Sequence, residues 1–123
     1  MDSILRTIRK MVLGLPINSE DTEEEKAFNT DLIIHINTAF SVLTQHGAGP
    51  EEGFIITDDS SKWTDFIGDK KTVEMLKSYV YIKTKLAFDP PQNSSAIGQM
   101  KESAEEYEWR IREAYEDYTS YAS

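Results

Sequence analysis

The chain has 123 residues, of which 39% are hydrophobic and 28% are charged, a composition typical of one ordinary water-soluble domain. Its formal net charge of −9 argues against a nucleic-acid-binding protein, because such proteins gain most of their affinity from phosphate contacts and are usually basic. It has no cysteine, which excludes disulfides, thiolate metal sites and a cysteine nucleophile, and no apolar run near the ~18 residues of a membrane span.

The first predicted element is a short amphipathic helix over residues 3–13, ended by Gly14 and Pro16. Basic residues interrupt its apolar pattern, so we expect no signal peptide here. A helix of three turns is marginal alone and must dock on another surface. The sequence leaves two surfaces open: the chain's own core, or a neighbouring subunit that the helix contacts as an arm. The apolar face of this helix consists of Ile4, Leu5, Ile8 and Val12.

Residues 17–27 are expected to form a linker rich in carboxylates. Thr22 and Glu25 have the spacing of a capping box, so a helical turn can begin inside it. An acidic run of this kind is typical of a solvated segment near a helix N-terminus, and a metal site is the less favoured interpretation.

A second helix is predicted from about Thr30 to His46, with Asn29 or Thr30 as its cap and Gly47 after its end. The two histidines, His35 and His46, lie three helical turns apart, or ~16 Å along the axis. One metal ion cannot bridge that distance, so both are expected to be structural. The core-facing row of this helix consists of Phe28, Leu32, Ile36, Phe40 and Leu43.

A long loop at 47–61 contains three glycines and a proline, and its residues 54–57 are the only β-like run in the chain. That run is too short to build a sheet, so it either pairs with the same segment of another subunit or fills the core with Phe54 and Ile56. A calcium loop starting at Asp58 is rejected, because Lys62 stands where an oxygen ligand is needed. Ser60 or Ser61 is expected to cap a short helix whose inward side chains are Trp63, Phe66 and Ile67.

The segment at 69–89 is predicted to be the central helix, with Asp69 as its cap and Pro90-Pro91 as its stop. Its apolar stripe is too broad for a surface helix, so we expect packing on both sides. The stripe consists of Val73, Met75, Leu76, Tyr79, Val80, Ile82, Leu86 and Ala87.

A last helix is predicted from Ser95 to about Tyr118, capped by Asn93 or Ser94, with a narrow seam of the heptad type. One interpretation is antiparallel packing on the central helix. The other is that its end binds another chain, because tyrosines are favoured at interfaces. Together these elements predict an all-α fold: a small bundle of about four to five helices around the helix at 69–89, with the long loop at 47–61.

No catalytic constellation is found in the sequence. The best enzyme alternative is a magnesium-dependent nucleotide pyrophosphohydrolase, which needs carboxylates at helical spacing on facing helices. Two such pairs exist, Glu20 with Glu23 and Glu105 with Glu108, but both lie on faces expected to be solvated, and the central helix offers only Glu74.

Three phrases occur in a specific order and spacing: a Gly-x-Gly-Pro turn at 47–50, Trp-Thr-Asp-Phe at 63–66, and Lys-x-Lys-Leu-x-Phe-Asp-Pro-Pro at 83–91. With the helix before them and the Tyr-Glu-Trp-Arg-Ile phrase after them, they resemble the head–tail connector (adaptor) family of tailed bacteriophages and prophages. The resemblance covers roughly residues 28–111. Asn29 stands where an aspartate is expected, a conservative change of cap.

The resemblance implies one connector domain over residues 1–123, with a helix at 3–13, a core at 28–111 and an extension at 112–123. It implies a structural protein of the virion neck that is assembled in the host cytoplasm. The protein would form an adaptor ring of about twelve subunits. This ring would lie between the portal protein and a stopper or tail-completion protein. Genomic DNA would pass through the ring without specific binding. No enzyme activity, cofactor or membrane partner is implied.

Three interface hypotheses follow from this assignment. The portal or a neighbour would contact Tyr107, Trp109, Arg110, Tyr115, Tyr118 and Tyr121. The arm on the adjacent subunit would consist of Ile4, Leu5, Ile8 and Val12. The loop that faces the next ring would present Glu51, Glu52, Phe54, Ile55, Asp58 and Asp59. The main rival is a small helical cytosolic protein-binding module, which would remain a monomer or dimer.

Overall fold

The computed structural model describes residues 3–17, 20–67 and 70–122, and the side chains as far as residue 116. In this part of the chain there is no strand, apart from one isolated antiparallel bridge between Ser3 and Lys62. The prediction of an all-α bundle is therefore confirmed. None of the described helices has the length and hydropathy needed to cross a bilayer. The elements in order are α1 (Ile4–Leu13), α2 (Glu23–Gln45), the 3-10 turn η1 (Trp63–Asp65), α3 (Lys70–Phe88) and α4 (Ser94–Ala122).

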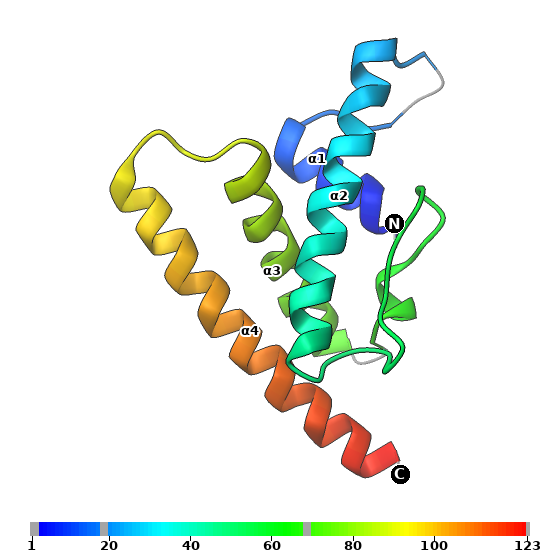
Figure 1. The fold of residues 1–123 in the computed structure, drawn as a ribbon, viewed down its shortest axis with the longest axis vertical. Coiled ribbons are helices and arrows are strands. Elements are labelled where there is room, and N and C mark those ends of the chain that lie inside the picture. The colour runs from blue at the N-terminus through cyan, green and yellow to red at the C-terminus, as the bar shows by residue number, and fades with distance from the viewer. Residues whose placement is uncertain (1–2, 18–19, 68–69, 123) are drawn as a thin grey trace.

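Helix α3 is the central element, as its broad apolar stripe predicts. It contacts α1, α2, α4 and η1, and the side chains of Leu76, Tyr79 and Val80 are fully buried. The helix ends at Phe88, just before the two prolines that cannot continue it. The expected cap, Asp69, lies outside the described residues. Figure 1 shows α4 on one side of α3 and α2 on the other.

The start of α2 corrects the sequence analysis. The helix begins at Glu23, one residue after its N-cap Thr22, rather than at Thr30. Thr22 Oγ1 accepts from the N–H of Glu25 at 3.1 Å, and Glu25 Oε1 accepts from the N–H of Thr22 at 3.0 Å. This capping box satisfies two donors at once, and the acidic first turn suits the helix dipole. The predicted capping box of Thr22 and Glu25 is therefore confirmed, whereas the prediction of a linker was wrong from residue 23 onward.

Helix α1 lies on the chain's own core, one of the two surfaces that the sequence left open. Ile4, Leu5 and Ile8 are buried, and Val12 packs partly against the same cluster. Arg9 is also buried, and its guanidinium binds both carboxylate oxygens of Asp21 at 2.7 and 3.2 Å. A role of α1 as an arm on a neighbour stays a prediction, and it would require this buried ion pair to open.

The long loop before η1 is fixed to α2 by side chains. Asn37 of α2 accepts from the N–H of Ile56 at 2.8 Å and donates to its carbonyl at 3.0 Å, so a side chain takes the place of a neighbouring strand. Ile56 is buried, and the Phe54 ring packs against Phe40 at a centroid distance of 4.9 Å. Of the two alternatives for this run, the structure shows the one in which it fills the core.

The cap expected before η1 is also corrected. Neither Ser60 nor Ser61 caps the turn; the carboxylate of Asp65 accepts from the N–H of Lys62 at 2.8 Å, and Ser60 bonds to Asp58 instead. Trp63 is buried, as expected.

The start of α4 follows one of the two expected caps. Asn93 Oδ1 accepts from the N–H groups of Ser95 and Ala96, at 2.8 and 3.2 Å. The side chains of Ala104 and Ile111 are buried against the core. Antiparallel packing on the central helix is therefore observed as far as the side chains are described.

Candidate functional site

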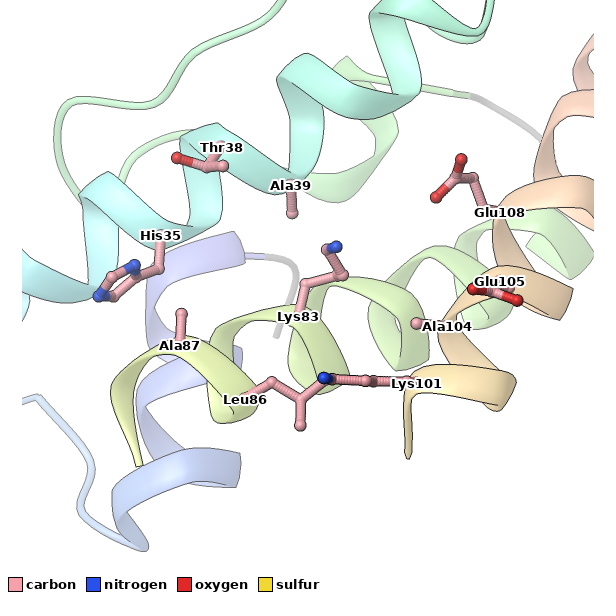
Figure 2. A pocket seen from close by; sticks show the side chains of 10 residues that line it. All are labelled: His35, Thr38, Ala39, Lys83, Leu86, Ala87, Lys101, Ala104, Glu105 and Glu108. Carbon is pink, nitrogen blue, oxygen red and sulfur yellow. The ribbon is translucent and has the colours of Figure 1, made fainter. Parts of the chain in front are cut away.

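A groove of about 450 Å³ opens between α2, α3 and α4, and we call it the α2–α4 groove (Figure 2). It exists because short side chains stand where the three helices face one another: Ala39 on α2, Ala87 on α3 and Ala104 on α4. Leu86 adds a larger apolar surface. The complete lining is His35, Thr38, Ala39, Lys83, Leu86, Ala87, Lys101, Ala104, Glu105 and Glu108.

Two lysines give this groove cationic groups that are free for a partner. Figure 2 shows the Lys83 side chain rising from α3 into the space between α2 and α4, while Lys101 extends from α4 towards α3. Lys83 is half-buried, and no ion pair or hydrogen bond joins it or Lys101 to another described residue. By contrast, Lys85 lies 2.8 Å from the carboxylate of Asp89. In a chain of net charge −9, unpaired cations in a groove favour an acidic partner.

One end of the groove is closed by Glu108, whose two carboxylate oxygens are both engaged. Oε1 lies 2.7 Å from Nε2 of His46, and Oε2 accepts from the Tyr79 hydroxyl at 3.2 Å. Burial of the Tyr79 side chain and the nearby negative charge of Glu108 raise the pKa of that phenol far above its ordinary value of 10. Glu108 therefore ties α4 to α3 and to the end of α2.

The carboxylates considered for magnesium do not converge. Glu105 and Glu108 both line the groove, whereas Glu20 and Glu23 do not. Among the residues that the structure describes, no three His, Cys, Asp or Glu side chains are grouped so as to hold a metal ion. The arrangement offers charges and apolar surface for a partner.

The residues predicted to contact the portal or a neighbour divide into two groups. Tyr107 and Tyr115 are partly buried and pack against the chain's own core. Trp109 is 56% exposed, and Arg110 is exposed while it pairs with Glu106 at 2.8 Å. The side chains of Tyr118 and Tyr121 lie outside the described part of the chain. Trp109 and Arg110 are therefore the two members of this set that the structure places at the surface.

The residues predicted to face the next ring are divided in the same way. Phe54 packs inward, and Asp59 binds the guanidinium of Arg6 at 2.8 Å. Asp58 is held in its own turn by hydrogen bonds from the Ser60 hydroxyl and N–H, which lower the pKa of its carboxyl. Asp58 is nevertheless exposed, as are Glu51, Glu52 and Ile55. We call the last three the loop ridge, and Ile55 among them is 67% exposed.

Comparison with known protein families decides the class of this molecule. The family model described as phage connector protein matches residues 4–118. The chain belongs to the phage connector protein family. Neither the comparison with curated proteins nor the comparison with solved structures finds a match.

Membership confirms the resemblance inferred from the sequence. The match extends beyond residues 28–111 to include α1 and most of α4, so these helices belong to the family fold. Phage connectors are a family of structural proteins rather than of enzymes. This connector therefore has a structural role at the junction of head and tail in the virion.

The α2–α4 groove is the feature of this connector that the sequence analysis did not find. Ala87 was assigned to the apolar stripe of the central helix, and nothing in that stripe indicates a gap between it and Ala39 or Ala104 on the other helices. The only available signal was the small size of the alanines at these positions. Whether these alanines lie next to one another depends on how the three helices cross.

Proposed function

We propose that this connector assembles as a closed adaptor ring of about twelve subunits between the portal and the next neck protein, and that the ring continues the channel through which DNA leaves the head. The observation that carries the proposal is the family match over residues 4–118. The net charge of −9 is consistent with a channel wall that DNA passes without binding, because like charges repel the phosphates. In this proposal, assembly takes place in the host cytoplasm.

The proposal needs surfaces for neighbours above, below and beside each subunit. The exposed Trp109 and Arg110 are candidates for the portal, together with the end of α4. The loop ridge is a candidate either for the next ring or for an adjacent subunit. A ring contact joins two different patches of the same chain, so each subunit must offer both halves of the interface.

The test is a pull-down of this connector with the portal ring from the same genome, followed by negative-stain imaging. A second ring stacked on the portal is the expected result. No binding by a folded chain would overturn the proposal and favour the protein-binding module, which stays a monomer or dimer.

The docking residues are tested in the same assay with matched variants of α4. Trp109→Ala removes a large exposed aromatic side chain and is expected to weaken portal binding about tenfold or more, since buried Trp residues dominate interface energies. Glu102→Ala, at another exposed position of α4, is the control and should bind as wild type. Equal binding of both variants would remove Trp109 from the portal interface.

A further inference from the structure

The α2–α4 groove and the loop ridge lie on opposite sides of α2. Figure 1 shows α3 and the first half of α4 on one side of this helix and the loop at 47–62 on the other, while the C-terminal end of α4 passes below the end of α2. The groove is lined from α2, α3 and α4, while the loop is bonded to α2 through Asn37. A head-to-tail interface between identical subunits requires two different patches on opposite flanks, and these two features have that arrangement.

The two features are also complementary in chemistry. The groove presents the unpaired ammonium groups of Lys83 and Lys101 above an apolar floor that includes Leu86. The ridge presents two exposed carboxylates, Glu51 and Glu52, beside Ile55, the most exposed of the large hydrophobic side chains described. Opposite charges at a rim fix the register of docking, and an apolar side chain that leaves water supplies affinity.

The ridge is held in place before any partner arrives. The two hydrogen bonds between Asn37 and the backbone of Ile56 fix the residue next to Ile55. On its other side, the Phe54 ring packs between Phe40 and Phe66, at centroid distances of 4.9 and 5.5 Å. Little backbone entropy at Ile55 is therefore lost when the ridge docks.

Two carboxylates in the groove, Glu105 and Glu108, oppose an acidic partner. Glu105 is exposed on α4, whereas Glu108 has both oxygens engaged by His46 and Tyr79. Removing the charge at position 105 is therefore expected to strengthen binding of an acidic ridge, and a basic partner would show the reverse.

We propose that the loop ridge of one connector subunit docks in the α2–α4 groove of the next, with Lys83 and Lys101 receiving the carboxylates of Glu51 and Glu52 and with Ile55 on the apolar floor. The proposal rests on the ring assembly proposed above, and names the surfaces that close it.

Disulfide trapping tests the contact directly, because the chain has no cysteine of its own. The full chain carrying Ile55→Cys and Ala87→Cys joins two exposed positions, one on the ridge and one in the groove. Mild oxidation should give a ladder of dimers, trimers and longer species that collapses on reduction. Each single variant should give dimers at most. The control pair, Ile55→Cys with Glu106→Cys on the face of α4 away from the groove, should give no ladder.

Charge reversal tests whether the two patches recognise each other. The groove variant Lys83→Glu/Lys101→Glu and the loop variant Glu51→Lys/Glu52→Lys should each reduce ladder formation at least about tenfold when placed in the double-cysteine chain. A mixture of the two variants should restore it, because each groove then meets a loop of opposite charge. Circular dichroism confirms that the variants fold. Glu105→Gln should increase the yield of the ladder.

The outcomes separate this proposal from the ring assembly itself. Trapping is done on the free protein and on the protein bound to the portal, where the subunits are brought together. If a portal-bound ring forms but no ladder appears in either sample, the loop–groove contact is overturned and the adaptor function stands. If a chain carrying Ile55→Cys is instead trapped only by an added neck protein that carries a cysteine of its own, the loop faces the next ring and the loop–groove contact is overturned. Loss of portal binding with an intact ladder would overturn the adaptor function alone.

Discussion

The imidazole of His46 lies 2.7 Å from the carboxylate of Glu108, and this contact joins the C-terminal end of α2 to the middle of α4. The same carboxylate accepts a hydrogen bond from Tyr79 of α3. Three helices from distant parts of the sequence thus meet at one side chain. Because this side chain also lines the α2–α4 groove, it links the groove to the packing of the three helices.

Removal of Glu108 should destabilise the bundle. In Glu108→Ala the buried Tyr79 hydroxyl loses its acceptor, and we expect the free energy of unfolding to fall by about 1–3 kcal/mol. The control Glu106→Ala breaks an exposed pair with Arg110 on the same helix and should cost about 0.5 kcal/mol or less. Urea unfolding followed by circular dichroism measures both. Equal losses would show that Glu108 does not tie the helices together.

Stability should decline at alkaline pH because of Tyr79. The folded protein raises the pKa of this phenol, so folding favours its protonated form. The resulting stabilisation is complete below the unfolded pKa of 10 and is lost progressively as the pH rises above it. We expect urea midpoints to fall between pH 10 and 11.5, and to fall less steeply in Tyr79→Phe, which has no proton to lose. A slope unchanged by this substitution would contradict the assignment.

The buried ion pair between Arg9 and Asp21 should be essential for docking α1. The two side chains are 1% and 3% exposed, so Arg9→Ala leaves a buried carboxylate without its main counter-ion. We expect a loss of about 3–5 kcal/mol and faster proteolytic cleavage in the segment between α1 and α2. Lys10→Ala, at the neighbouring exposed position, should change stability by about 0.5 kcal/mol at most. A similar stability for both variants would rule out this role.

Two glycines in the loop provide a matched pair. Gly47 and Gly49 both have positive φ, 90° and 82°, so alanine should cost about 1–2 kcal/mol at either position. At Gly49 the added Cβ would also collide with the ring of Phe66, whereas the space at Gly47 is open. Gly49→Ala should therefore be the more damaging by at least ~1 kcal/mol, as measured by thermal or urea unfolding. The reverse order would mean that Phe66 moves aside without cost.

Much of the secondary structure was predictable because local chemistry sets it. Gly14 ends α1 with a φ of 71°, and Pro90 prevents α3 from continuing. The error at α2 had a local cause as well. Both Thr22 and Asn29 carry cap chemistry, and the sequence does not say which is used. The structure shows Asn29 accepting from Arg9 at 3.2 Å while Thr22 forms the capping box, so a contact with α1 accompanies the earlier start.

For the interfaces, the sequence predicted the types of residue involved but not which of these residues are exposed. The sequence marks aromatic and acidic side chains, but exposure depends on which face of each helix the core takes. Tyr107 and Trp109 are two residues apart, and the first packs on the core while the second is 56% exposed. In the loop, Phe54 packs inward and its neighbour Ile55 points outward.

The sequence by itself determined the helical class, the central position of α3, most helix ends and the family, because periodicity, caps and ordered motifs act over a few residues. The tertiary structure alone decided the docking of α1, the pairing of Asn37 with Ile56 and the α2–α4 groove. Each of these depends on groups far apart in the chain, and their meeting is fixed by how the helices cross and pack.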